Sequence, residues 1–347
     1  MTSRQNSHSD NQKTGKDWKN KLISSSLPLE FEVGRILTRQ KFNITADYTY
    51  ARSAQDAHGI IKDFSVDLHA RGYLPFTNSD SNTAYLELLV ECKQRNPFNK
   101  WLFLPKIGNY KLRSEISSGR SIRLLDQFST RIDKDNGTCD FDKKGPFCYK
   151  GIEIDLKNGI VKDDEIKHGI SQLQYALPRL ISEWVEEASE FDETMTDKEM
   201  RDCANPVFFC PILLTTSNLF ILKSNMTIDD IEKADNLSNI AKQVPYLFLS
   251  SDCSPDFEKH CKNVCEPLGE LEFPLLTEYR KKNGERDYQL PKQIAGMLAD
   301  GYYTDFFSEF VVCSLDSFPL LLDRIKSVTR NVTRKLTADY KKRESLN

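Results

Sequence analysis

Hydrophobic and polar residues alternate with the two-residue period of β-strands in three successive segments of the chain. The segments are residues 42–51, FNITADYTYA; residues 60–70, IIKDFSVDLHA; and residues 84–95, AYLELLVECKQR. The first is rich in β-branched and aromatic residues, which strands favour, and Gly, Asn, Ser and Asp fill the connections. The pattern therefore predicts three consecutive strands joined by loops.

Three other segments repeat their apolar residues with the spacing of helices that bury one face. They are residues 27–42, 164–188 and 318–340. Their apolar stripes consist of Leu29, Val33, Ile36 and Leu37; of Ile166, Ile170, Leu173, Leu177, Leu180 and Ile181; and of Leu321, Leu322, Ile325, Val328, Val332 and Leu336.

Further short apolar runs predict strands at 206–215 and, after a turn at 216–218, at 219–222. Two more are predicted at 245–250 and 309–314. Strands and helices mixed in this order favour an α/β domain around a central mixed sheet that is flanked by helices.

The remaining segments have weaker patterns. Residues 1–25 are polar and predict a disordered or loosely attached tail. Residues 105–163 carry turn signals but little periodicity, which predicts an insertion with little regular structure. The acidic run at 183–202 predicts a solvated loop, and residues 228–243 predict a polar helix.

The length and composition fit a folded protein of one or two domains. The chain has 347 residues, of which 39% are hydrophobic and 29% charged, so it can build a core. We expect that core at 26–223, followed by an extension at 224–347 that packs on it or completes it. The formal net charge of -3 excludes no class of partner, because a local basic patch can be hidden in the sum.

Neither a membrane span nor a secretory signal is expected. The sequence has no run of about 20 apolar residues, and its polar N-terminal segment lacks the apolar core of a signal peptide. We therefore expect a cytoplasmic protein, whose nine cysteines are free thiols.

Residues 86–95, LELLVECKQR, place two charged side chains in an apolar run. Because side chains two apart in a strand point the same way, Glu91 and Lys93 share one face with Leu89. If the preceding strand pairs with this one, Asp67 comes close to Glu91. Two nearby carboxylates repel each other unless a cation lies between them, and oxygen ligands without a His or Cys cluster favour Mg²⁺.

Two carboxylates with a nearby lysine form a coherent set for phosphodiester hydrolysis. A divalent ion can polarise a phosphodiester oxygen and lower the pKa of a bound water. Lys93 can orient that water or stabilise the charge that develops on phosphorus. The alternative is that Glu91 and Lys93 flank a strand end and pair with each other or with solvent.

Asp67, followed by Glu91-Cys92-Lys93 on the next strand, resembles the PD-(D/E)XK nuclease superfamily, whose pattern is Asp … (Asp/Glu)-x-Lys. Three stretches look like its restriction-endonuclease-like (Mrr-type) branch, in which a first-helix Glu precedes an aromatic-led strand. They are LEFEVGRILTRQKFNI, SVDLHARG and LELLVECKQRNPFNKWLFL. The later PVFFCPILLTTSNLFIL looks like the strand pair that follows the second core helix in such proteins.

The resemblance covers about residues 27–110 and 160–223. It implies a restriction-endonuclease-like core in which Asp67 and Glu91 bind Mg²⁺ or Mn²⁺. It also implies that Lys93 is the catalytic lysine and that Gln94 is an accessory group.

The carboxylate of the first helix is ambiguous between Glu30 and Glu32. Glu30 lies near the apolar face, twelve residues before the aromatic Phe42, and this spacing fits the family better. In SQLQYAL, Gln172 and Tyr175 approximate the Gln/Tyr motif of exonuclease-like branches, which makes Gln172 an accessory candidate. A valine stands where the superfamily often has Pro before the first Asp.

Basic residues follow the acid-x-Lys segment, with aromatic residues among them. They predict either a phosphate-contacting surface beside the active strand or a solvated, mildly basic insertion. The candidates for contact with nucleic acid are Arg95, Lys100, Lys106, Lys111 and Arg113. His69 shares a face with Asp67 and could line the site, while a structural role is the other interpretation.

The sequence is compatible with three functions. The first is an Mg²⁺-dependent endonuclease acting on DNA, with RNA not excluded, in restriction or defence and as a homodimer; the presence of all three catalytic residues favours it. The second is a catalytically silent nuclease-like module that binds nucleic acid or protein. The third is a zinc-stabilised interaction protein that uses Cys253, His260, Cys261 and Cys265, although these lack C-x₂-C spacing.

Overall fold

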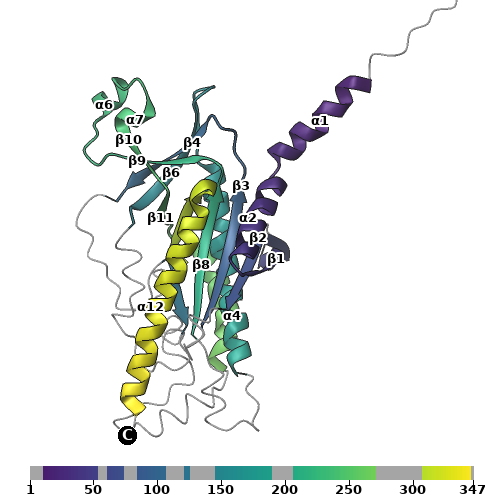
Figure 1. Ribbon diagram of the computed structural model, residues 1–347, viewed down its shortest axis with the longest axis vertical. Helices are drawn as coiled ribbons and strands as arrows, with labels where there is room; N and C mark the ends of the chain where they lie inside the picture. The colour runs from purple at the N-terminus through teal and green to yellow at the C-terminus, as the bar shows by residue number, and fades with distance from the viewer. Residues whose placement is uncertain are drawn as a thin grey trace, which may run out of the picture.

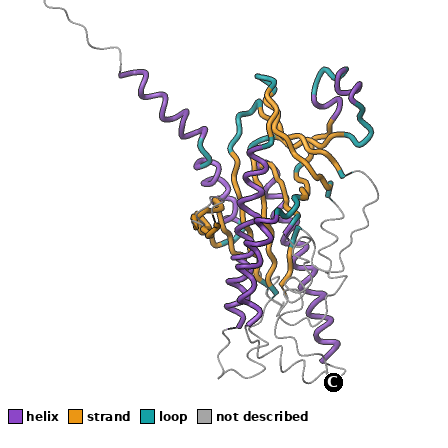
Figure 2. The backbone as a smooth tube through the Cα atoms, turned by 180° about the vertical axis from the view of Figure 1, so that it is seen from behind, coloured by secondary structure: helices purple, strands orange, loops and turns teal. Residues whose placement is uncertain are grey.

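The chain folds around one mixed β-sheet of twelve strands with helices on both faces, as Figures 1 and 2 show. The structure is a computed structural model that describes residues 11–53, 61–73, 84–106, 121–125, 145–189, 206–270 and 307–344. This architecture confirms the prediction of an α/β protein with a central mixed sheet. Within the described ranges, no helix combines the length and the apolar character needed to cross a membrane.

The described helices are α1 (Asn11–Ser24), α2 (Leu27–Arg39), α4 (Asp164–Ser189), α6 (Ile228–Glu232), α7 (Leu237–Ile240), α8 (Pro255–Cys265) and α12 (Phe318–Glu344). The described strands are β1 (Asn43–Ser53), β2 (Ile61–Tyr73), β3 (Tyr85–Lys93), β4 (Asn99–Pro105), β5 (Arg123–Leu125), β6 (Phe147–Asp155), β7 (Ile160–Lys162), β8 (Val207–Thr215), β9 (Asn218–Leu222), β10 (Ala241–Val244), β11 (Tyr246–Ser250) and β12 (Glu309–Ser314).

The strands follow the order β1-β2-β3-β8-β12-β11-β6-β4-β9-β10, with β5 beside β8 and β7 beside β6. β1, β2 and β3 are successive antiparallel neighbours. β3 is parallel to β8 along its whole length, from the pair Tyr85–Val207 to the pair Lys93–Thr215. Parallel neighbours need a crossover connection, and the long helix α4 lies within the one that joins β3 to β8.

Two apolar cores lie on opposite faces of the sheet. α4 and α8 cover the face that includes Leu89 and Leu213, whereas α2 and α12 cover the face that includes Val90 and Cys92. Figure 1 places α12 in front of β8 and α4 behind the sheet. β3 is buried on both faces, so its sequence is a continuous apolar run except at Glu87, Glu91 and Lys93.

The three predicted helices with apolar stripes and most predicted strands are confirmed. Every residue of the predicted stripe of α4, from Ile166 to Ile181, is buried, and so are the predicted stripe residues of α12 from Leu321 to Val332. The side chain of Leu336 lies outside the described residues. The two strands predicted at 206–222 also form, but β8 and β9 pair with different neighbours and not with each other.

The prediction of an irregular insertion at 105–163 is wrong for its described parts. Residues in this range supply β5, β6 and β7, and β6 lies inside the sheet between β11 and β4. The burial of β6 alternates imperfectly along the strand. Its strand conformation therefore depends on pairing with segments that are distant in sequence. The local pattern of apolar residues does not reveal such pairing.

Three other predictions need correction. Residues 11–24 of the expected tail form α1, which extends away from the rest of the chain in Figure 1. Residues 228–243 form two short helices and most of β10 where one polar helix was predicted. The acidic run at 183–202 begins as the end of α4, and the rest of it lies outside the described residues.

Candidate active site

Asp67 and Glu91 lie where β2 separates from β3. The ladder between the two strands runs as far as the pair Leu68–Val90, and the next position would join Asp67 and Glu91. There, side chains replace the ladder bonds. The backbone N–H of Cys92 donates to Asp67 Oδ2 (2.6 Å), and the backbone N–H of Asp67 points to Glu91 Oε2 (3.4 Å). The prediction that Asp67 comes close to Glu91 is thus confirmed.

The separation of the strands coincides with a bend in the β1–β2 ribbon. Leu68 belongs to the core under α2 and α12, whereas Val66, on the same side of the ribbon, belongs to the core under α4. Opposite Asp67, Asp47 has a left-handed backbone with φ of 54°, a conformation that aspartate tolerates better than most residues. The ribbon therefore crosses from one face of the sheet to the other at Asp67.

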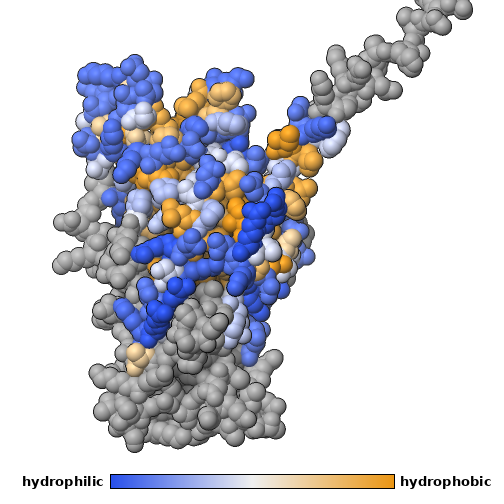
Figure 3. Space-filling model, viewed as in Figure 1, coloured by the Kyte–Doolittle hydropathy of each residue, from blue (hydrophilic) through white to orange (hydrophobic). Residues whose placement is uncertain are grey.

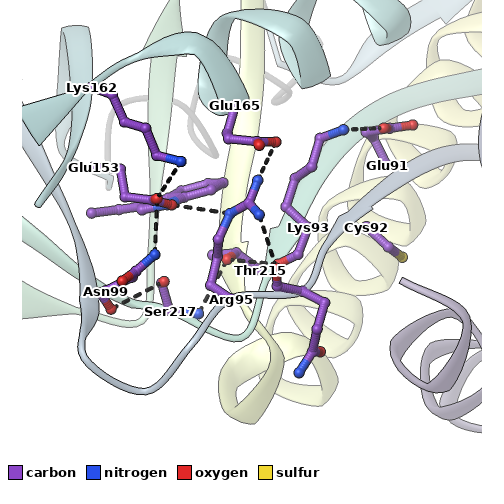
Figure 4. Close-up of polar contacts among 12 residues, drawn as sticks. Glu91, Cys92, Lys93, Arg95, Asn99, Glu153, Lys162, Glu165, Thr215 and Ser217 are labelled. Carbon is purple, nitrogen blue, oxygen red and sulfur yellow. Dashed lines mark hydrogen bonds and ion pairs between the residues drawn. The ribbon is translucent and has the colours of Figure 1, made fainter. Parts of the chain in front are cut away.

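Lys93 joins the carboxylates to α4. Its Nζ donates to Glu91 Oε1 (2.8 Å) and to Gln172 Oε1 (3.3 Å), and Figure 4 shows the Glu91 contact. The Gln172 side-chain amide in turn donates to the carbonyl oxygen of Ser65 (2.9 Å). Gln172, a predicted accessory residue, therefore bridges the lysine to the strand that carries Asp67.

Gly169 lets α4 approach these side chains. A Cβ at this position would lie 2.5 Å from Leu213 Cδ1, 3.1 Å from Lys93 Cε and 3.4 Å from Glu91 Cγ. Any larger residue would displace the leucine and press on the lysine stem. The helix can thus cover Glu91 and Lys93 closely because residue 169 has no side chain.

Burial shifts the pKa of both carboxyl groups upward. Burial raises the pKa of Asp67 to about 6; the Cys92 N–H opposes this shift, and the charge of Glu30 adds to it. Burial raises the pKa of Glu91 to about 7; the charge of Asp67 adds to the shift, and Lys93 opposes it. The site thus holds more negative charge than its lysine can balance.

This donor set fits a magnesium or manganese ion. Two carboxylates whose ionised forms are disfavoured by burial and mutual repulsion gain from a cation between them. Among the described residues, no group of three or more His, Cys, Asp or Glu side chains is arranged to enclose a metal. A two-carboxylate site suits Mg²⁺, which commonly takes its other ligands from water and substrate phosphate.

The two helix carboxylates lie in different environments. Glu30 is partly buried, its charge raises the pKa of Asp67, and it lines a groove of about 570 Å³ together with Phe31 and Leu68. Glu32 is exposed to solvent. Glu30 is therefore the helix carboxylate that acts electrostatically on the site.

His69 is used elsewhere. Its ring Nε2 forms a hydrogen bond with the buried Glu87, which also accepts a hydrogen bond from Arg71 Nε (2.7 Å), and its ring packs on Tyr48. No contact of its side chain with Asp67 or Glu91 is found among the described residues. These contacts support the structural interpretation of His69.

The prediction that Arg95 contacts nucleic acid does not fit its surroundings. Its side chain is only 16% exposed, and its guanidinium forms ion pairs with Glu153 (3.0 Å) and Glu165, as Figure 4 shows. A guanidinium held by two carboxylates is not available to phosphate. Its contact with the Gln94 backbone carbonyl (3.0 Å) also ties down the strand end.

The other basic residues that were predicted to contact nucleic acid lie in different surroundings. Lys100 Nζ donates to the Pro97 carbonyl (2.8 Å), and Lys106 is half-buried after β4. Lys111 and Arg113 lie outside the described residues. The side chain of Gln94, a predicted accessory group, is half-buried.

The sequence gives little indication of a buried polar cluster around Glu153. This carboxylate is 1% exposed and accepts hydrogen bonds from Asn99 Nδ2 and Trp101 Nε1, both at 2.9 Å. Lys162 Nζ lies 3.4 Å from it. The only signal is the glutamate in the apolar alternation GIEI, whose importance appears once β6 is known to pair with β4.

Hydroxyl groups hold the end of β3. Thr215 Oγ1 donates to the Lys93 carbonyl (3.0 Å), and Thr216 Oγ1 accepts from the Arg95 N–H (2.8 Å) and donates to its carbonyl (3.1 Å). The predicted turn at 216–218 therefore fixes the backbone on both sides of Gln94.

The cysteines do not form a recognisable zinc site. Cys253, Cys261 and Cys265 form no disulfide with another described residue. His260 Nε2 instead contacts the carbonyl oxygen of Tyr175 (3.0 Å). Because the described residues contain no metal-enclosing group of three such side chains, the zinc-stabilised alternative gains no support.

Comparison with known proteins identifies no relative of the chain. No family model, no curated protein and no solved structure matches the chain. The function must therefore be argued from the geometry of the site.

Proposed function

We propose that the chain is a metal-dependent nuclease that hydrolyses phosphodiester bonds, with DNA as the favoured substrate. The observation that carries the proposal is the meeting of Asp67, Glu91 and Lys93 at one point of the sheet. The lysine Nζ lies 2.8 Å from a Glu91 oxygen, and Asp67 accepts the backbone N–H between them. These are the residues to which the resemblance to PD-(D/E)XK nucleases assigns the chemistry.

The order of elements supports the same proposal. A helix with Glu30 precedes β1, β2 carries Asp67, β3 carries Glu91 and Lys93, and α4 then leads to β8. This is the order that the resemblance implies. A restriction-endonuclease-like core would comprise α2, β1, β2, β3, α4 and β8, with the remaining strands as extensions of its sheet.

Each residue has a role in the proposed hydrolysis. Asp67 and Glu91 would hold Mg²⁺ or Mn²⁺, which supplies positive charge against the phosphoryl oxygen. Lys93, fixed by Glu91 and Gln172, would stabilise the negative charge that develops on phosphorus. Glu30 would add negative charge that favours cation binding. A role in restriction or defence, and a homodimer, stay predictions from the resemblance.

The second candidate is a nuclease-like module without catalysis. The side chains of Glu91 and Lys93 are only 2% and 12% exposed, and they already bond to each other. A phosphodiester would have to displace part of this cover to reach them. A module that binds nucleic acid or protein through another surface needs no such opening.

A cleavage assay distinguishes the two candidates. Supercoiled plasmid, linear duplex, single-stranded DNA and RNA would each be incubated with the protein in Mg²⁺, Mn²⁺ or EDTA. We expect cleavage that needs metal and that is lost in Asp67→Asn and Lys93→Met. Lys233→Met, at an exposed position after α6, is the matched control. A folded wild-type protein that cuts none of these substrates would support the silent module.

A further inference from the structure

The turn after β3 and the β6–β7 hairpin form an exposed apolar surface. Its members are Phe98, Leu156 and Val161, which are 54%, 53% and 58% exposed; Ile160 precedes Val161 in β7 and so points to the other face of the strand. The Leu156 N–H donates to the Phe98 carbonyl (3.2 Å) and so joins the turn to the hairpin. Figure 3 shows hydrophobic residues at the upper end of the molecule, above the β4 and β6 labels of Figure 1. We name Phe98, Leu156 and Val161 the Phe98 surface.

Lysines border the Phe98 surface. Lys157 Nζ lies 6.0 Å from the centroid of the Phe98 ring. Lys100 reaches back to the same turn through the Pro97 carbonyl. Lys162 follows Val161 and so points to the other face of β7, where its Nζ lies 3.4 Å from Glu153. Two ammonium groups, those of Lys157 and Lys100, therefore stand near the exposed apolar side chains.

The nearby carboxylates are held by other partners or by their own turn. Glu153 is buried and paired with Arg95 and Lys162, and Asp163 is paired with Lys167 at 2.6 Å. Asp155 accepts the N–H groups of its own turn, including that of Lys157 (2.9 Å). Among the described residues, neither Lys100 nor Lys157 forms an ion pair with a carboxylate, although the exposed Asp155 lies close enough to Lys157 for the two charges to interact.

The turn fixes the backbone of Phe98. Asn96 Oδ1 accepts the Phe98 N–H (3.0 Å), and the Asn96 carbonyl accepts the Asn99 N–H (2.8 Å). Pro97 between them has a restricted backbone. The buried Trp101 anchors the strand that follows. When a ligand binds, only the torsions of the Phe98 side chain therefore remain to be ordered at this position.

We propose that the Phe98 surface binds unpaired nucleotides of a single-stranded nucleic acid. One base would stack on the Phe98 ring, and the neighbouring phosphates would lie near Lys157 and Lys100. An aromatic platform beside lysines suits single strands, because base stacking and backbone charge together give binding without sequence preference. Bases within a duplex are already stacked on each other and cannot offer a free face.

The location connects this surface with the candidate active site. β3 ends at Lys93, and the turn that carries Phe98 follows directly. Lys162 and Arg95 share Glu153 as a partner, which ties the hairpin to the end of β3. The effect of this surface on cleavage rests on the proposed function. If the chain is a nuclease, single strands or the unpaired ends of duplexes would be its preferred substrates.

Binding measurements in EDTA test the inference without requiring cleavage. Fluorescence anisotropy would compare a labelled thymidine oligonucleotide with a blunt hairpin duplex of the same length. We expect the single strand to bind more tightly and Phe98→Ala to weaken it by about 5- to 100-fold, the usual effect of losing one stacked base. Phe98→Trp should retain binding because it keeps the platform.

Leu320→Ala provides the matched control, since Leu320 is an apolar residue of α12 that is 58% exposed. Its affinity for the single strand should equal that of the wild type. Unchanged affinity in Phe98→Ala, equal affinity for the two oligonucleotides, or no binding of either would overturn the inference. Because EDTA prevents metal-dependent cleavage, Phe98-dependent binding by a protein that never cuts would contradict only the proposed nuclease.

Discussion

Asp67 and Glu91 occupy positions where side chains replace hydrogen bonds that the sheet no longer makes. Each carboxylate receives a backbone N–H, yet burial raises the pKa of the first to about 6 and of the second to about 7. Hydrogen bonding thus only partly offsets burial. Carboxyl groups held this way reduce stability at neutral pH, which is common where function requires them.

Asp67→Asn is expected to stabilise the folded chain at neutral pH while it abolishes cleavage. Asparagine keeps an oxygen for the Cys92 N–H but removes the buried charge, a gain of about 1–3 kcal/mol. The folded pKa of Asp67, about 6, exceeds its ordinary value of 3.8. Between these values the folded state binds more protons than the unfolded state, so the stability contributed by this group falls as pH rises.

The advantage of Asp67→Asn should therefore be small below about pH 4 and complete above about pH 7. Urea unfolding of the variant and the wild type at acidic, intermediate and neutral pH measures it. An advantage that is largest in acid would contradict the burial account of Asp67.

Arg95→Ala is expected to act on stability rather than on nucleic-acid affinity. It would leave Glu153, which is 1% exposed, with only the longer ion pair to Lys162 (3.4 Å), and breaking a buried pair on one side costs up to about 3–5 kcal/mol. Thermal unfolding measures this loss, and Arg95→Met with Glu153→Gln should recover part of it. A variant with wild-type unfolding temperature and weakened oligonucleotide binding would restore Arg95 as a phosphate contact.

At the scale of elements, the close approach of α4 to β3 determines the geometry around Lys93. Gly169→Ala would place a methyl group 2.5 Å from Leu213 Cδ1 and 3.1 Å from Lys93 Cε. We expect a loss of about 1–3 kcal/mol in unfolding free energy and slower cleavage. Gly34→Ala in α2 is the control, because its Cβ would meet only Ile44 Cδ1, at 3.8 Å. Equal effects of the two substitutions would contradict the account.

The sequence predicted the elements that carry the site because their signals are local. β3 has apolar flanks on both faces, and α4 has a continuous stripe. β6 has a weaker pattern because its burial depends on pairing with β4 and β11. The partners of Arg95, Glu153 of β6 and Glu165 of α4, are distant in sequence. The sequence therefore predicted an exposed basic residue at a position where the structure has a buried ion pair. Gln172 was found through its motif, whereas Tyr175 bonds to Asp256 instead (2.6 Å).

At the scale of the whole molecule, the sheet brings together carboxylates that lie 24 residues apart in sequence and encloses them under α4. The resulting excess of negative charge predicts that divalent ions stabilise the fold. At about 100 times the dissociation constant, Mg²⁺ or Mn²⁺ should add roughly 2.7 kcal/mol. Thermal unfolding with and without metal measures this gain, which Glu91→Gln should lose. A gain of the same size in Glu91→Gln would place the ion elsewhere.

The catalytic role of Lys93 is tested by the initial rate of DNA cleavage by Lys93→Met in Mg²⁺, relative to wild type. Methionine keeps about the length of the lysine stem that packs on α4 and removes the ammonium group. We therefore expect the variant and the wild type to unfold at similar temperatures. The account predicts a rate lower by about 10²- to 10³-fold, the usual effect of losing one group that stabilises transition-state charge. A metal-dependent rate equal to that of the wild type would contradict it.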